Sequence, residues 1–171
     1  MNKRRYGKYL LAVAVAAGLC SLLILTVQWK RKMEARSGRI GCVNYLNQIC
    51  LAFRQWSLDS GDKLPFNVST NLGGTLELCA RGPDGFDRNA VFHFQVLSNE
   101  LNTPKCLVCP KDSSRQAAVD FSVLRPENIS YRLYSGTNVS LEFPQAILAV
   151  CSIDGNAVRV DGSIFKLPHN R

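Results

Sequence analysis

The longest uninterrupted apolar stretch of the chain lies near its start, at residues 9–29. It reads YLLAVAVAAGLCSLLILTVQW and contains no charged residue. As a helix with a rise of about 1.5 Å per residue it would be about 31 Å long, which matches the hydrocarbon thickness of a bilayer. Because lipid offers no partners to backbone amides, a stretch of this composition is stable there as a helix. The pattern predicts a transmembrane helix.

Basic side chains flank this stretch on both sides: Lys3, Arg4, Arg5, Lys8, Lys30, Arg31 and Lys32. Tyr9 and Trp29 stand at its ends, where interfacial aromatic residues are expected. A cleaved signal peptide is the alternative, but its apolar region usually has about 7–15 residues and ends at a small-residue cleavage site. We therefore expect an uncleaved anchor, with residues 1–8 as a cytoplasmic tail and the following domain exported.

The helical pattern continues beyond the apolar stretch, over residues 30–57. Apolar side chains recur there at spacings of three and four residues: Cys42, Leu46, Ile49, Phe53 and Trp56. This spacing is typical of an amphipathic helix that lies on a core. Gly38 and Gly41 mark the expected bend, and the sequence DSGD at residues 59–62 marks the end of the helix.

Residues 58–171 are enough for one globular domain. We expect a short helix at 90–101 and a helical turn at 117–124, while 75–79 is either a short strand or a helical turn. Strands are expected at 106–109, 129–134 and 146–153, followed by a hairpin over 158–166. One long N-terminal helix followed by late antiparallel strands predicts an α+β fold.

The net charge of +8 is concentrated beside the apolar stretch. Residues 1–8 contribute +4, and residues 30–40 contribute another +4 from five basic residues against Glu34. Basic flanks of this kind meet anionic lipid headgroups. A nucleic-acid partner would favour a basic face on the folded domain, which is neutral here. The expected partner is the lipid bilayer, with no nucleic acid.

Six of the seven cysteines follow the apolar stretch: Cys42, Cys50, Cys79, Cys106, Cys109 and Cys151. An even number of cysteines in an oxidising compartment predicts disulfides or buried thiols. Cys42 and Cys50 are separated by about 12 Å along a helix and cannot pair with each other. The CxxC pair of Cys106 and Cys109 is the alternative, as a redox or metal site, although a strand would point the two thiols to opposite faces.

Other residues offer little catalytic chemistry. His93 lies between two phenylalanines on an apolar helix face and is expected to be a packed histidine. Asp154, Asn156 and Asp161 carry oxygen ligands for calcium, but their spacing fits no calcium loop, and two turns explain them. We expect no enzyme activity, no cofactor and no small-molecule substrate.

The segment CVNYLNQICLAFRQWSLDSGDKLPF resembles the region after the membrane helix in bacterial type II secretion pseudopilin-like (G-type) proteins. The matching residues are Cys42, Asn44, Leu46, Gln48, Ile49, Leu51, Ala52 and Pro65. The segment 94–112 is similar to the family segment that ends in Cys-Pro-x-Asp, and VDGS at 160–163 is similar to its late turn. The resemblance implies a pilin-like lollipop, in which an N-terminal helix spans the bacterial inner membrane and its C-terminal half packs on a small antiparallel sheet in the periplasm.

The chain departs from this family near its start. Members that assemble carry a glycine followed by Phe-Thr-Leu-x-Glu, whereas here Gly7 is followed by KYLLA and the apolar stretch has no glutamate. A carboxylate in lipid is costly and persists for a reason, so its absence removes the assembly device. The predicted function is a non-enzymatic, membrane-anchored structural or accessory component of a type II secretion or pilus-like system, with secretion-system or pilus-like subunits as partners. A membrane-tethered thiol-redox or metal-binding protein is the alternative.

Overall fold

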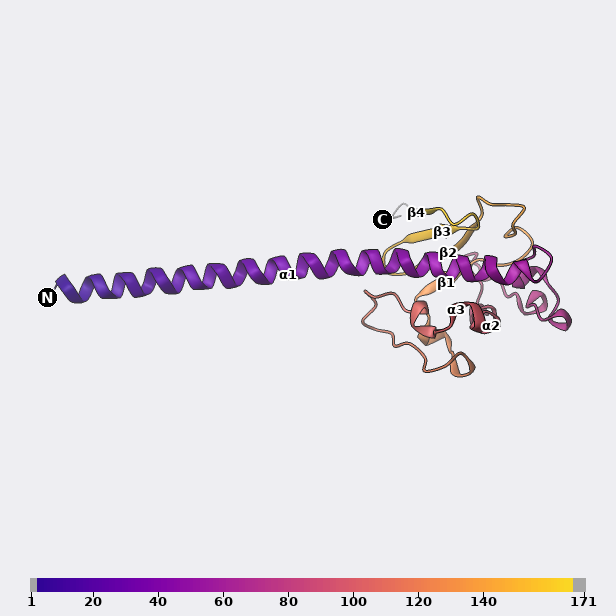
Figure 1. Ribbon diagram of the computed structural model, residues 1–171, viewed down its shortest axis with the longest axis horizontal. Helices are drawn as coiled ribbons and strands as arrows, with labels where there is room; N and C mark the ends of the chain where they lie inside the picture. The colour runs from indigo at the N-terminus through magenta and orange to yellow at the C-terminus, as the bar shows by residue number, and fades with distance from the viewer. Residues whose placement is uncertain (1–2, 168–171) are drawn as a thin grey trace. The chain divides into compact units, whose positions relative to one another are not determined.

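The first element of the fold is a helix much longer than any other in the chain. The computed structural model describes the backbone of residues 3–167 and the side chains of residues 18–167. Helix α1 runs over Lys3–Leu58 without a break (Figure 1). The chain divides into two compact units, Met1–Ser37 and Gly38–Arg171. The helical backbone continues through the glycines at which the sequence pattern indicated a bend.

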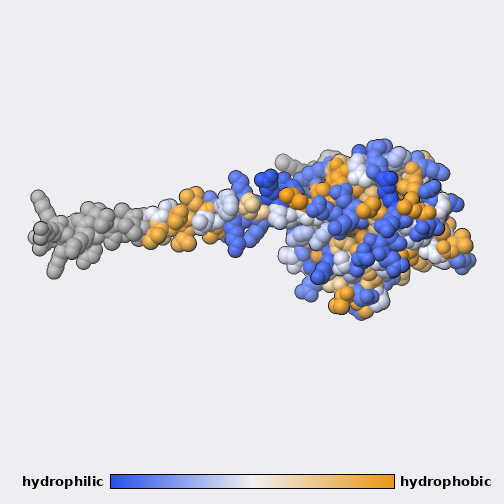
Figure 2. All heavy atoms as spheres, viewed as in Figure 1, coloured by the Kyte–Doolittle hydropathy of each residue, from blue (hydrophilic) through white to orange (hydrophobic). Residues whose placement is uncertain are grey.

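The predicted membrane span is only partly covered by these residues. Its residues 9–17 lie outside the part of the chain whose side chains are described. Within the part that is described, no helix reaches both the length and the apolar character needed to cross a membrane. In the first unit, large apolar side chains at residues 19–27 are exposed, and they form the orange band that precedes a hydrophilic segment in Figure 2.

The last part of α1 forms the centre of the core of the second unit. The predicted apolar stripe is confirmed, because Cys42, Leu46, Ile49 and Phe53 are fully buried and its last member, Trp56, is partly buried against the core. Cys50 connects this helix face to the sheet, since its Sγ donates a hydrogen bond to the Arg159 carbonyl at 3.4 Å. The helix therefore lies against the sheet by one face, as its period of 3.6 residues requires.

The sheet is a four-stranded antiparallel meander with the order β1-β2-β3-β4. Its strands are β1 (Tyr131–Leu133), β2 (Ile147–Cys151), β3 (Asn156–Arg159) and β4 (Ile164–Lys166). Tyr131 pairs with Cys151, and Ala157 pairs with Phe165. The expected strands at 129–134 and 146–153 and the terminal hairpin are confirmed with small shifts of their ends. Together with α1 they confirm the α+β class.

Short helices connect α1 to the sheet and complete the core. The predicted helix at 90–101 is confirmed as α2 (Ala90–Val96) followed by α3 (Ser98–Leu101). Phe94 of α2 packs against Phe53 of α1, with ring centroids 6.1 Å apart. The remaining turns are the 3-10 helices η1 (Pro65–Asn67), η2 (Thr70–Leu72), η3 (Leu76–Leu78), η4 (Pro104–Leu107), η5 (Phe121–Val123) and η6 (Pro126–Asn128).

The predicted strand at residues 106–109 is wrong. Residues 104–107 form the 3-10 helix η4, in which Pro104 occupies the first turn and the Thr103 side chain accepts a hydrogen bond from the Lys105 amide. A proline is well suited to the start of a helical turn, because its fixed φ is already helical and its missing N–H would have no partner there. The apolar pair Leu107-Val108 was therefore misleading as a strand signal.

Candidate functional site

Three buried cysteines from distant parts of the chain meet in the core of the second unit. Cys42 lies on α1, Cys109 follows η4, and Cys151 is the last residue of β2. Their Sγ atoms all lie within 4.8 Å of one another. The three residues are 0%, 1% and 1% exposed, so the group has no open path to solvent. We call Cys42, Cys109 and Cys151 the thiol cluster.

Two glycines on α1 allow the loop that carries Cys109 to approach the helix. A Cβ at Gly41 would lie 2.9 Å from Pro110 Cγ, and a Cβ at Gly38 would lie 2.8 Å from Lys111 Cγ. Both distances are too short for a Cβ to fit unless the side chain of Pro110 or Lys111 moves. Because Gly38 and Gly41 are three residues apart, they share one helix face. The spacing was visible in the sequence, but we interpreted these glycines as a bend.

Polar hydrogens point at two of the three sulfur atoms. The Asn156 side-chain amide donates to Cys42 Sγ at 3.8 Å, and the Asp154 backbone N–H donates to Cys151 Sγ at 3.5 Å. A hydrogen bond from Cys42 lowers the pKa of Cys151, and backbone N–H groups lower it further. The pKa of Cys42 is correspondingly raised by its contact with Cys151 and by burial. The donors from Asn156 and Asp154 therefore favour negative charge in the cluster over three neutral thiols.

The cysteines outside the thiol cluster make separate local contacts. Cys106 Sγ donates to the Thr103 carbonyl at 3.1 Å, and burial raises the pKa of Cys106 to about 11. Burial also raises the pKa of Cys50 to about 11. A thiol with such a pKa is a poor nucleophile, which gives no support to a redox pair of Cys106 and Cys109. All seven cysteines are free thiols in this structure, so the pairing of the six disulfide candidates stays a prediction.

A second polar group, centred on Asp87, is buried on another side of the core. Its carboxylate lies 3.1 Å from His93 Nε2, accepts a hydrogen bond from the Ser135 hydroxyl, and accepts the Asn89 backbone N–H at 2.7 Å. Burial alone raises the pKa of Asp87, but these hydrogen bonds outweigh burial and hold it at about 2. His93 Nδ1 lies 2.7 Å from Thr75 Oγ1, so both ring nitrogens have partners.

Hydrogen bonds link Thr75 to His93 and His93 to Asp87, as in a catalytic group of a nucleophile, a general base and an acid that orients the base. Thr75 and His93 are fully buried, however, so a substrate has no access to the hydroxyl. Cys79, Asp87 and His93 also lie close enough for a metal ion. Such an ion would have to displace hydrogen bonds that already satisfy His93 and Asp87. The arrangement supports a structural role, in agreement with the expected packed histidine.

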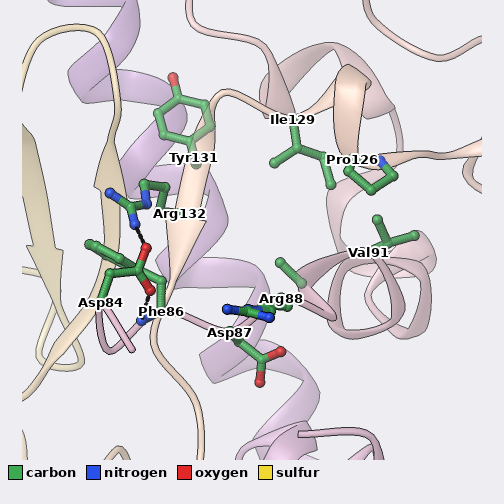
Figure 3. A pocket seen from close by; sticks show the side chains of 10 residues that line it. Asp84, Phe86, Asp87, Arg88, Val91, Pro126, Ile129, Tyr131 and Arg132 are labelled. Carbon is green, nitrogen blue, oxygen red and sulfur yellow. Dashed lines mark hydrogen bonds and ion pairs between the residues drawn. The ribbon is translucent and has the colours of Figure 1, made fainter. Parts of the chain in front are cut away.

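A small pocket lies between residues 84–91 and β1 (Figure 3). Its volume is about 180 Å³. Arg132 forms an ion pair with Asp84 at its edge, and the Arg132 guanidinium lies 3.6 Å from the centroid of the Phe86 ring. Sites for small molecules usually have about 300–1,000 Å³. This pocket is below that range, whereas two other hollows, one of about 500 Å³ beside Leu51 and Leu58 and one of about 430 Å³ beside Gln95 and Phe121, fall within it.

Each aspartate considered for calcium has at least one carboxylate oxygen with a protein partner, while Asp154 Oδ2 is buried without one among the described residues. Asp154 Oδ1 accepts a hydrogen bond from Lys111 Nζ at 2.7 Å, and Asp161 Oδ1 accepts one from the Ser163 backbone N–H at 2.8 Å. The Asn156 amide is directed at Cys42. These side chains make hydrogen bonds in two different turns and at the thiol cluster. Their contacts favour the interpretation as turn residues over a calcium site.

The basic residues Lys30, Arg31 and Lys32 are exposed on α1, whereas Lys3, Arg4, Arg5 and Lys8 lie outside the described side chains. A comparison of the chain with protein families, curated proteins and solved structures finds no match.

Proposed function

We propose that this chain is a non-enzymatic pseudopilin-like protein of the bacterial inner membrane. The single observation that carries the proposal is the organisation of α1. Its residues from Gly38 onward form the core helix of a domain with a four-stranded antiparallel meander, and its earlier residues form a separate unit. One helix that serves both as the core of an α+β domain and as an apolar extension is what the pseudopilin-like architecture requires.

The exposed apolar side chains of the first unit support a bilayer as the partner. Leu19, Leu22, Leu23, Ile24 and Leu25 are each at least 57% exposed. Apolar surface of this extent in an exposed helix is unfavourable in water and favourable in lipid. We propose that residues 9–29 span the membrane, with residues 1–8 in the cytoplasm and the second unit in the periplasm.

The same organisation favours a structural or accessory role in a type II secretion or pilus-like system. The polar groups of the second unit that resemble catalytic arrangements are buried, which supports a structural or accessory role over an enzymatic one. The apolar stretch lacks the glutamate by which members of the resembled family assemble. We therefore propose that contacts with secretion-system or pilus-like subunits are made by the periplasmic domain and not by a glutamate in the membrane helix.

Carbonate extraction followed by N-terminal sequencing tests the anchor. We expect the wild-type protein to stay in the membrane pellet with its N-terminus uncleaved. The double substitution Leu19→Arg with Leu23→Arg places two cations near the middle of the span, at a cost of about 5–7 kcal/mol, and should release the protein from the pellet. A matched control places arginine at Leu58 and Leu72, which are 73% and 78% exposed in the second unit.

The control should extract as the wild type does. A soluble wild-type product that begins near residues 20–40, or equal extraction of the two double variants, would refute the anchor. Co-purification from membranes then tests the partners: secretion-system components should accompany the wild-type protein, and their absence would leave an anchored domain without the proposed role.

A further inference from the structure

The thiol cluster is the part of the core that the proposed function does not use. Its three sulfur atoms come from a helix, a loop and a strand, and they are separated by more than 40 residues at each step along the sequence. A disulfide would use two of them and leave the third unexplained. We propose that Cys42, Cys109 and Cys151 together bind one thiophilic d10 metal ion, Zn²⁺ or Cu⁺. This inference does not depend on the membrane anchor.

The distances between the sulfur atoms suit a single ion. Zinc–sulfur bonds are about 2.3 Å long, so thiolates around a tetrahedral ion lie about 3.8 Å apart. The three Sγ atoms are within 4.8 Å of one another, and movements of about 1 Å or less would bring them to that separation. Soft thiolate ligands select Zn²⁺ and Cu⁺ over harder cations.

The surroundings of the sulfur atoms suit thiolates. The Asn156 amide and the Asp154 backbone N–H both donate to cluster sulfurs. Groups that donate to metal ligands fix their orientation and compensate their charge. A neutral, purely apolar packing of three thiols would need none of these donors.

Tyr131 supplies an independent indication. Its hydroxyl is buried and has no hydrogen-bond partner among the residues that the structure describes. Figure 3 shows this hydroxyl directed away from the ion pair of Asp84 and Arg132. Tyr131 of β1 lies directly opposite Cys151 of β2 in the antiparallel register, so the two side chains share one face of the sheet and Tyr131 adjoins the cluster. An orphaned buried hydroxyl calls for a partner, and a metal-bound thiolate is a strong acceptor.

Binding has a defined proton balance. Each metal–sulfur bond that forms replaces an S–H bond, and the proton goes to solvent. No electron is transferred, and no oxidant or reductant is needed. The bound ion would join α1, the loop after η4 and β2, and it would stabilise the folded domain because the unfolded chain does not hold the three thiols together.

Metal titration of the full chain tests the proposal. The protein is purified in mild detergent with a reductant, stripped with a chelator, and titrated with Zn²⁺ in one arm and with Cu⁺ under anaerobic conditions in the other. We expect one ion per chain from at least one of the two metals and an increased melting temperature. With Co²⁺ as a spectroscopic probe, we expect the charge-transfer absorption of thiolate ligands. This absorption reports thiolate coordination in the wild-type protein, without any substitution.

Substitutions locate the site. Cys109→Ser and Cys151→Ser should each lower the affinity by at least about tenfold, and Asn156→Ala should lower it by about 10- to 100-fold through loss of a supporting hydrogen bond. The matched controls are Cys50→Ser and Cys106→Ser, which replace buried cysteines outside the cluster and should bind as the wild type does.

Three results would overturn the proposal. The wild-type chain binds neither metal and shows no thiolate-to-cobalt absorption; the control variants lose the ion as readily as the cluster variants; or non-reduced peptide mapping of protein taken directly from membranes shows a disulfide between two of the three cysteines.

Discussion

Truncation of Phe53 removes the centre of the contact between α1 and the rest of the domain. Phe53 is fully buried, and its ring lies 5.6 Å from Phe66 and 6.1 Å from Phe94, measured between centroids. Phe-to-Ala changes in a core cost about 3–5 kcal/mol, and each aromatic pair contributes about 0.5–1.5 kcal/mol beyond its area. Because two aromatic partners are lost here, we expect Phe53→Ala to cost about 4–5 kcal/mol.

This loss is a large part of the free energy of unfolding of a small domain, which is about 5–15 kcal/mol. It corresponds to a decrease in melting temperature of about 10–20 °C, measurable by circular dichroism or by calorimetry. The matched control is Leu51→Ala on the same helix, because Leu51 is 63% exposed. Its effect should stay within about 0.5 kcal/mol. Equal melting temperatures for the two variants would refute the packing of α1 on the core.

The structure also decides against a control that the sequence suggests. Arg54 follows Phe53 and, from the helical pattern alone, faces away from the core. In the structure, however, Arg54 Nη1 donates a hydrogen bond to the Asp161 carbonyl at 3.0 Å. Arg54→Ala would therefore remove a contact between α1 and the turn before β4, so Leu51 is the better reference.

Two further predictions concern the acid range and backbone packing. The pKa of the Asp87 carboxyl is about 2 in the folded chain, below its value in an unfolded chain. The ionised carboxylate therefore stabilises the folded state by about 2 kcal/mol above about pH 4. This stabilisation is lost as the pH falls through about 2. Asp87→Asn should reduce the change in unfolding free energy over this range, and an unchanged pH dependence would contradict the hydrogen-bonded carboxylate. Gly74→Ala should cost about 1–3 kcal/mol, because its Cβ would clash with the backbone carbonyl of Val68. Gly18→Ala is the control, since a Cβ there meets no atom within 4 Å, and equal stabilities would contradict the close approach.

The sequence by itself determined the elements whose signals are local. The alternation of apolar residues every three or four positions predicted the buried face of α1, from Cys42 to Phe53, because a helix places these positions on one side. Turn residues and β-branched runs predicted β2 and the hairpin of β3 and β4. The helix at 90–101 and the α+β class followed from the same local patterns.

Tertiary structure alone decided which distant residues meet. The thiol cluster joins Cys42, Cys109 and Cys151, which lie far apart in the sequence. Sequence motifs for metal sites consist of cysteines a few residues apart, so no such motif indicates this group. The approach of the loop depends on Gly41, whose missing side chain leaves room for Pro110. The surroundings of Asp87 likewise bring together residues as distant as Ser135. Such contacts depend on how whole elements pack, and that packing is a property of the folded chain that no short stretch of sequence contains.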